Sequence, residues 1–248
     1  MSASTVPPPP PPLLVVWDFD WSLIDENTDT WIFKALAPGL VDDLKRTEQF
    51  PVWTDRVQDA LRRLFAEYGV TRDTLLETMQ GIPIHQGMIE TIKTLHGAGA
   101  EQIILSDSNT EFIQCILAKH DLSKYFRAII TNPAEFDGEG RLHVRPHQAA
   151  ESPHYCDLCP PQLCKGGQLQ AILRTMRSAQ RDLQCIYVGD GRGDLCPCIG
   201  LGDRDVVLAR KGYPLLDHLA KTRVRARVVP WQDGDEALSA VNAFLQYM

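Results

Sequence analysis

The sequence lacks any long apolar segment. The longest apolar run near its start, Leu13–Trp17, is far shorter than the roughly 18 residues needed to cross a bilayer. The first residues also lack the basic and apolar regions of a signal peptide and carry a run of prolines instead, Pro7–Pro12. We therefore expect a cytoplasmic protein without membrane contact, whose residues 1–12 form a disordered proline-rich tail.

An excess of positive charge is also absent. The formal net charge is −7, from 25 Lys and Arg against 32 Asp and Glu. Nucleic-acid surfaces normally show a basic excess, so binding along a phosphate backbone is not expected. The seven cysteines are an odd number, which suits reduced thiols better than a disulfide framework. These features favour a small-molecule partner and leave protein partners undefined.

Short apolar segments alternate with amphipathic ones along most of the chain. A hydrophobic fraction of 44% and a charged fraction of 23% are typical of a globular protein. Alternating buried strands and helices predict an α/β fold, a doubly wound, Rossmann-like parallel sheet. The expected strands are 13–17, 102–106, 127–131, 185–189, 205–208 and 226–229, and the helices between and after them are 110–120, 166–179, 215–223 and 235–247.

The gap between the first two expected strands is too long for a single crossover. It contains amphipathic segments such as Trp53–Tyr68 and Thr71–Met79. We interpret residues 25–82 as a helical cap inserted after the first strand. Residues 13–24 and 83–248 then form the core.

Polar side chains follow three of the expected strands. Asp18 and Asp20 follow the first, Ser106 and Asp107 end the second, and Asp190 and Asp194 follow a later one, while Lys165 begins a helix. Ligands of open α/β sheets bind at the carboxyl ends of the strands, so these groups are expected at one edge. Carboxylates with a hydroxyl and a lysine suit Mg²⁺ binding and phosphoryl transfer.

The order of these motifs resembles that of the haloacid dehalogenase-like phosphatases. Finer features resemble the eukaryotic phosphoethanolamine/phosphocholine phosphatase family and its pyridoxal phosphate phosphatase relatives. These features are Asp18-Phe19-Asp20 leading to Ile24-Asp25-Glu26-Asn27-Thr28-Asp29, then Ile104–Thr110, Cys156-x-x-Cys159-Pro160 leading to Cys164-Lys165, and Val188–Gly191 leading to Asp194-x-Cys196-Pro197. The resemblance extends from about Leu14 to Trp231.

The resemblance implies a Mg²⁺-dependent phosphomonoester hydrolase with an aspartyl-phosphate intermediate. Asp18 would be the nucleophile and Asp20 the general acid and base. Ser106 and Lys165 would bind the phosphate. The metal would be held by the Asp18 carboxylate, the Asp20 carbonyl and Asp190, with Asp194 as a ligand or hydrogen-bonded beside it.

The substrate expected from the resemblance is a small phosphate ester with a cationic head group. Asp29 and Asp107 would face a phosphoethanolamine or phosphocholine nitrogen, although either could simply cap a helix. Trp21 and Ser22 depart from the usual family residues, a charged residue and a threonine, and Trp21 could narrow the entrance or add a cation–π contact. Pyridoxal phosphate, thiamine monophosphate and pyrophosphate remain alternative substrates.

Other interpretations stay open at this point. A receiver-type phospho-switch has its motifs in a different order, and an inactive scaffold would be expected to have lost part of the constellation. His154, Cys156, Cys159 and Cys164 have donor types that could bind zinc, or they could pack the loop before Lys165. Cys196–Cys198 is expected to be a structural turn. One of three histidines, 143, 147 or 154, could border the pocket.

Overall fold

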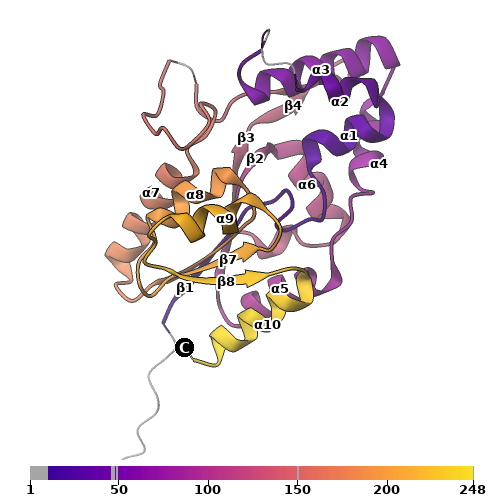
Figure 1. The fold of residues 1–248 in the computed structure, drawn as a ribbon. Helices are drawn as coiled ribbons and strands as arrows, with labels where there is room; N and C mark the ends of the chain where they lie inside the picture. Colours follow the sequence, from indigo (N-terminus) through magenta and orange to yellow (C-terminus); the bar gives the residue numbers. More distant parts are fainter. Residues whose placement is uncertain (1–10, 46–47, 49, 150, 248) are drawn as a thin grey trace, which may run out of the picture.

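The computed structural model describes residues 11–45, 48, 50–149 and 151–247. At its centre is a six-stranded parallel sheet with the strand order β3-β2-β1-β6-β7-β8 (Figure 1). This confirms the predicted α/β fold, and every expected strand is present within a few residues of its expected bounds. The strands are β1 (Leu13–Trp17), β2 (Glu101–Asn109), β3 (Ala128–Asn132), β6 (Gln184–Gly189), β7 (Val206–Arg210) and β8 (Arg227–Trp231).

Helices cover both faces of the sheet, so its strands are buried on both sides. One face packs against α5 (Gln86–Gly97), α6 (Thr110–Lys119) and α10 (Gly234–Leu245), and the other against α7 (Lys165–Ala179), α8 (Leu195–Ile199) and α9 (Pro214–Lys221). Val15 of β1 belongs to the first apolar cluster and its neighbour Val16 to the second. This alternation is what a central parallel strand requires, because successive side chains point to opposite faces.

Among the described residues, four further helices lie between β1 and α5 in the sequence. They are α1 (Thr28–Leu36), α2 (Gly39–Asp43), α3 (Trp53–Tyr68) and α4 (Arg72–Met79). Figure 1 shows them gathered at one end of the molecule, away from α5 and α10. The chain segments leading to and from them meet where the Asp25 N–H donates to the Pro83 carbonyl oxygen at 3.0 Å.

A small antiparallel hairpin joins this helical layer and was not predicted. β4 (Ala134–Phe136) pairs with β5 (Leu142–Val144), and the Val144 N–H donates to Gln58 Oε1 of α3 at 2.6 Å. Leu142 and Val144 are buried in the same apolar cluster as Leu61 of α3. Strands of three residues are too short to show a periodic pattern, so the sequence does not indicate them.

The structure also bears on the predictions about membranes and the tail. None of the helices in the described ranges is long and apolar enough to cross a bilayer. The tail predicted for residues 1–12 lies, up to residue 10, outside the described residues.

Candidate active site

The carboxyl ends of β1, β2 and β6 bring the predicted residues to one edge of the sheet. Trp17, the last residue of β1, pairs with Ile104 of β2 and Val188 of β6. The Asp18 N–H continues this pairing by donating to the Val188 carbonyl oxygen at 2.9 Å. Because the three strands are parallel neighbours, the polar residues at or just beyond their ends share this edge, as predicted.

An irregularity in β2 shapes this edge. The pairs Leu105↔Ile130 and Asn109↔Asn132 leave residues 106–108 of β2 opposite a single residue of β3. Asn132 Nδ2 stabilises the bulge by donating to two carbonyl oxygens in this range, at 2.6 and 3.0 Å. Bulges re-aim side chains, and this one lies where the predicted phosphate-binding hydroxyl occurs.

Lys165 is buried between two carboxylates. Its Nζ lies 2.7 Å from Asp18 Oδ1 and 2.9 Å from Asp194 Oδ1, and the residue is only 3% exposed. Burial alone would lower the pKa of Lys165, but the charges of Asp18, Asp194 and Asp107 raise it well above its ordinary value. The ammonium is therefore a fixed positive charge beside Asp18.

Asp194, in the 3₁₀ turn η2 (Arg192–Asp194), has both oxygens engaged. Oδ1 accepts from Lys165 Nζ and, at 2.7 Å, from the Tyr187 hydroxyl. Oδ2 accepts from the N–H groups of Asp190 at 3.1 Å and Gly191 at 2.9 Å. With four donors on one carboxylate, this side chain is suited to positioning Lys165 and the loop that carries Asp190.

The carboxylates of Asp18, Asp190 and Asp194 form a compact set of hard oxygen donors. One oxygen from each lies within 4.8 Å of the others. Asp190 accepts a hydrogen bond from the Ser22 hydroxyl at 3.1 Å. Three buried carboxylates face one ammonium here, an imbalance that a divalent cation would relieve. The residues present therefore fit Mg²⁺.

The same crowding of negative charge perturbs the acids of this set. Burial and the charge of Asp194 raise the pKa of Asp18 well above its ordinary value, against the opposing effect of Lys165. The same causes raise the pKa of Asp190 to about 7. An added positive charge would stabilise the ionised form of these carboxylates.

Asp20 is held by the start of α1. Its Oδ1 accepts from the Thr28 N–H at 3.0 Å, and its Oδ2 accepts from the Thr28 hydroxyl and Asn27 Nδ2, each at 3.1 Å. Since the Thr28 hydroxyl donates to Asp20, it accepts from the Ser108 hydroxyl, 2.7 Å away. Burial raises the pKa of Asp20 well above its ordinary value, although the bonds from Thr28 oppose this. Buried Ser106 accepts from the Ser108 N–H at 3.1 Å.

The two predicted substrate-binding carboxylates lie close enough to repel each other. Asp29 Oδ2 accepts from Trp53 Nε1 at 2.6 Å. Burial raises the pKa of Asp29 to about 6 despite this bond, and the charge of Asp107 adds to the effect. Burial also raises the pKa of Asp107, whose Oδ1 is buried without a hydrogen-bond partner in the described part of the protein. Buried carboxylates that are not fully paired favour a cation between them.

Trp21 adopts a left-handed backbone conformation, with φ at 57°. Arg210 Nη1 donates to its carbonyl oxygen at 2.6 Å. Its ring lies 5.8 Å from that of Tyr213, and the Lys34 ammonium lies 5.9 Å from the ring centroid. A lysine of the chain itself thus makes a cation–π contact with this ring.

The cysteine prediction needs a correction. Cys156, Cys159 and Cys164 do come together, but the fourth member of the group is Cys196, and His154 is not part of it. Both His154 ring nitrogens are occupied by the backbone of the same loop. Cys196 belongs to the short helix α8, where the sequence analysis expected a turn.

The other two candidate histidines also have partners outside the acidic set. His143 Nε2 lies 2.9 Å from Asp137 Oδ2, and His147 Nδ1 lies 3.0 Å from the Thr131 carbonyl oxygen. The contact of His143 lies within the β4–β5 hairpin, and that of His147 links the following segment to the end of β3.

Sequence reasoning assigned no role to several residues that hold the site. Asn27 and Thr28 belong to the motif that follows Asp20, and their position at the start of an amphipathic helix was a signal for capping. Tyr187 was detectable as a hydroxyl-bearing side chain in an otherwise apolar strand. Nothing local to Trp53 indicated its bond to Asp29, because the two residues are 24 positions apart.

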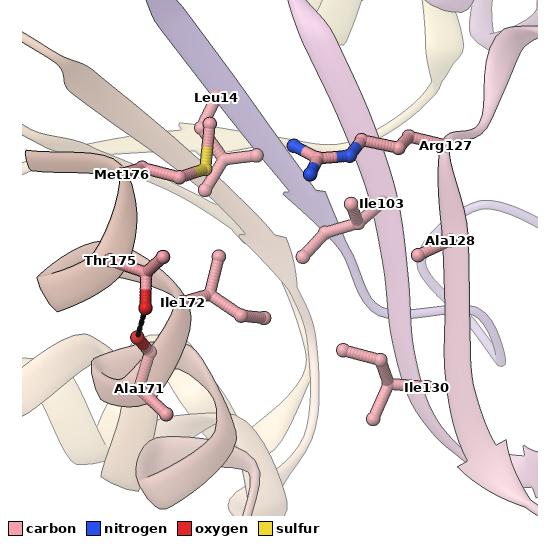
Figure 2. Close-up of a pocket in the computed structure, with 9 residues that line it drawn as sticks. All are labelled: Leu14, Ile103, Arg127, Ala128, Ile130, Ala171, Ile172, Thr175 and Met176. Carbon is pink, nitrogen blue, oxygen red and sulfur yellow. Dashed lines mark hydrogen bonds between the residues drawn. The ribbon is translucent and has the colours of Figure 1, made fainter. Parts of the chain in front are cut away.

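An apolar pocket of about 350 Å³ lies elsewhere, between α7 and the strands β1, β2 and β3 (Figure 2). The charged side chain of Arg127 lines it together with apolar side chains such as Ile103 and Ile172. None of the predicted catalytic, metal-binding or phosphate-binding residues borders it. The acidic edge of the sheet is therefore the better candidate for an active site.

Known proteins are similar to this chain in sequence or in fold over nearly its full length. Mouse pyridoxal phosphate phosphatase PHOSPHO2 is 36% identical over 236 residues, covering 91% of this chain and 95% of the relative. Inorganic pyrophosphatase 2 of Arabidopsis thaliana is 34% identical, covering 90% and 80%. A structure titled as a phospho-aspartyl intermediate analogue of phosphoserine phosphatase has the same fold, with a TM-score of 0.60 at 16% identity, covering 96% and 100%.

The match to a protein family covers almost the whole chain. A family described as "Putative Phosphatase" matches residues 13–245, which include every candidate site residue. A HAD-family hydrolase from Salmonella enterica serovar Typhi shares the fold with a TM-score of 0.61, at 14% identity and covering 92% and 71%. The chain therefore belongs to this phosphatase family, and it has the fold of the HAD-family hydrolase.

Proposed function

We propose that this phosphatase hydrolyses small phosphate esters in a Mg²⁺-dependent reaction through a phosphoryl group carried by Asp18. The observation that supports this most strongly is the 2.7 Å contact between Lys165 Nζ and Asp18 Oδ1 in a buried acidic set. An Asp18 oxygen would bond to phosphorus while the bond from phosphorus to the leaving oxygen breaks. Water would then attack phosphorus and restore the Asp18 carboxylate.

Asp20 is proposed to move the protons. Its raised pKa favours the protonated form needed to give a proton to the leaving alcohol. Once ionised, its carboxylate would take a proton from the attacking water. The bonds from Thr28 and Asn27 would hold the carboxyl group in place for both steps.

Mg²⁺ would be held by the Asp18 carboxylate, the Asp20 carbonyl oxygen and Asp190. When bound, the ion would neutralise charge on the phosphate and on these carboxylates. Lys165 would bind a phosphate oxygen, with Asp194 fixing its ammonium. The Ser106 oxygen accepts from the Ser108 N–H, so the Ser106 hydroxyl proton is available to donate to the phosphate.

A cationic head group is the substrate feature that the charges favour. Asp29 and Asp107 are buried and repel each other, and Oδ1 of Asp107 has no hydrogen-bond partner among the described residues. An ammonium between them would relieve both effects. Residues 25–82 would act as the cap that encloses it. Phosphoethanolamine and phosphocholine have this chemistry and are our first candidates.

A second group of substrates is favoured by the names of the relatives. The mouse relative is named for pyridoxal phosphate and the Arabidopsis relative for inorganic pyrophosphate, and another Arabidopsis relative is described as thiamine phosphate phosphatase-like. Thiamine monophosphate also carries a positive charge, whereas pyrophosphate does not. Charge recognition and these names therefore agree on thiamine monophosphate and disagree on pyrophosphate.

The experiment is a phosphate-release assay with Mg²⁺ on phosphoethanolamine, phosphocholine, pyridoxal phosphate, thiamine monophosphate, pyrophosphate and glycerol phosphate. We expect the first two to have the highest kcat/KM. A preference for pyridoxal phosphate, thiamine monophosphate or pyrophosphate would reject phosphoethanolamine and phosphocholine as the substrates while leaving the proposed phosphatase activity in place. No release from any ester, including a chromogenic aryl phosphate, would contradict the proposed activity itself.

A further inference from the structure

Four cysteines form a cluster beside the acidic site, and the proposed hydrolysis makes no use of it. The Sγ atoms of Cys156, Cys159, Cys164 and Cys196 all lie within 4.8 Å of one another. The Cys156 and Cys196 sulfurs are 3.5 Å apart. All four are free thiols in the structure. Four sulfurs this close together could bind one metal ion.

The spacing of the sulfurs matches a four-thiolate metal site. Zinc–sulfur bonds of about 2.3 Å in a tetrahedron place the sulfurs about 3.8 Å apart. The 3.5 Å separation and the 4.8 Å upper limit bracket this value. A disulfide needs about 2.05 Å and joins two sulfurs only, so it would leave the other pair unexplained.

The backbone around the sulfurs is shaped to accommodate them. Cys164 is the N-cap of α7, and its Sγ accepts from the Gly167 N–H at 3.2 Å. A Cβ on Gly166 would lie 2.3 Å from the Cys196 sulfur, so glycine at this position makes room for that sulfur. N–H donors to ligand atoms orient them and support a bound metal.

His154 supports the loop and is not available as a ligand. Its Nδ1 accepts from the Cys156 N–H at 3.2 Å, so Nε2 carries the proton and donates to the Pro160 carbonyl oxygen at 2.8 Å. Both nitrogens are thereby used within the turn that contains Cys156 and Cys159. The candidate donor set is therefore four sulfurs and no imidazole.

We propose that Cys156, Cys159, Cys164 and Cys196 bind one structural Zn²⁺ ion. Four protons leave the thiols for solvent as four zinc–sulfur bonds form, and no position remains open for a substrate. The ion would tie the 156–164 loop and α8 to the start of α7. Cys164 precedes Lys165 directly, and Cys196 follows Asp194 by two residues. The metal would thus fix the two ends of the Lys165–Asp194 contact.

The test is the metal content of the full chain, isolated under reducing conditions from zinc-replete cells without chelators. We expect elemental mass spectrometry to find about one zinc ion per chain, as a single four-thiolate site requires. Cys159→Ser and Cys196→Ser should each lose most of it. Cys115→Ser is the matched control, because Cys115 lies on α6 with its thiol directed to the Leu76 carbonyl oxygen. His154→Ala should also keep the zinc.

Two results would overturn the proposal. One is wild-type protein without zinc, and the other is zinc that remains stoichiometric in Cys196→Ser. A disulfide would be recognised by fewer than seven titratable thiols in a separate sample that is isolated and unfolded without reductant. Cobalt substitution of the wild type, read from the absorption of tetrahedral cobalt thiolates, keeps the test valid if a variant does not fold. These readouts need no turnover, so their failure is separate from that of the proposed hydrolysis.

Discussion

Replacing Asp29 by asparagine should stabilise the fold at neutral pH. Burial raises the pKa of Asp29 from its ordinary 3.8 to about 6 in the folded protein. Each pKa unit corresponds to about 1.4 kcal/mol, so the ionised carboxylate costs about 3 kcal/mol of folding free energy at pH 7. Asparagine removes this cost, and its Oδ1 can still accept from Trp53 Nε1.

The sign of the pH dependence follows from the raised pKa. Below the unfolded pKa near 4, Asp29 is protonated in both states and imposes no cost. As the pH rises toward the folded pKa of about 6, the unfolded state loses its proton first, and the folded state becomes relatively less stable. The advantage of Asp29→Asn should therefore be near zero below pH 4, about half developed at pH 5 and nearly complete above pH 6.

Urea unfolding of the wild type and of Asp29→Asn between pH 4 and 8 measures this difference. Glu77→Gln is a matched control, because it removes the charge of an exposed carboxylate on the neighbouring helix α4. The control should change the free energy of unfolding by less than about 0.5 kcal/mol at every pH. A gain for Asp29→Asn that does not vary with pH, or no gain at pH 7, would refute the reasoning.

Three further predictions concern the site itself. Asp29→Asn should lower kcat/KM for phosphocholine roughly 5- to 150-fold, which corresponds to a loss of about 1 to 3 kcal/mol of transition-state stabilisation, and should leave kcat/KM for glycerol phosphate nearly unchanged. Equal losses for the two esters would argue against head-group recognition. Asp20→Asn should slow alkyl esters roughly 10²- to 10⁴-fold and aryl esters far less in single-turnover assays, and equal slowing would remove Asp20 from the acid role. Tyr187→Phe should destabilise the fold by about 1 to 3 kcal/mol in urea unfolding, because Asp194 loses one of its four donors, and an unchanged midpoint would contradict this.

The parallel sheet and the shared edge could be predicted because their signals are local. An apolar run such as Cys185–Gly189 followed by Asp190 is visible in a few residues, and the rule that parallel strands end at one edge places Asp190 near Asp18. The structure bears this out, with one oxygen of each within 4.8 Å of the other. Helix bounds such as Trp53–Tyr68 were also correct, because the apolar spacing extends over several turns.

The parts that could not be predicted depend on contacts between distant segments. Cys196 lies 40 positions from Cys156, and the two sulfurs meet only where α8 packs near the start of α7 and the loop that precedes it. His154 was the obvious fourth donor by spacing, but its ring is already satisfied by the turn around it. The β4–β5 hairpin is likewise stabilised by its contacts with α3, among them the bond to Gln58.

The most direct test of the account is whether Asp18 carries the phosphoryl group. Protein quenched during turnover with Mg²⁺ is treated with borohydride, which reduces an acyl phosphate of aspartate to homoserine, and the peptides are analysed by mass spectrometry. We predict homoserine at position 18 when substrate is present and none in its absence. Steady turnover with an unmodified Asp18, or with the modification at another carboxylate, would contradict the central claim.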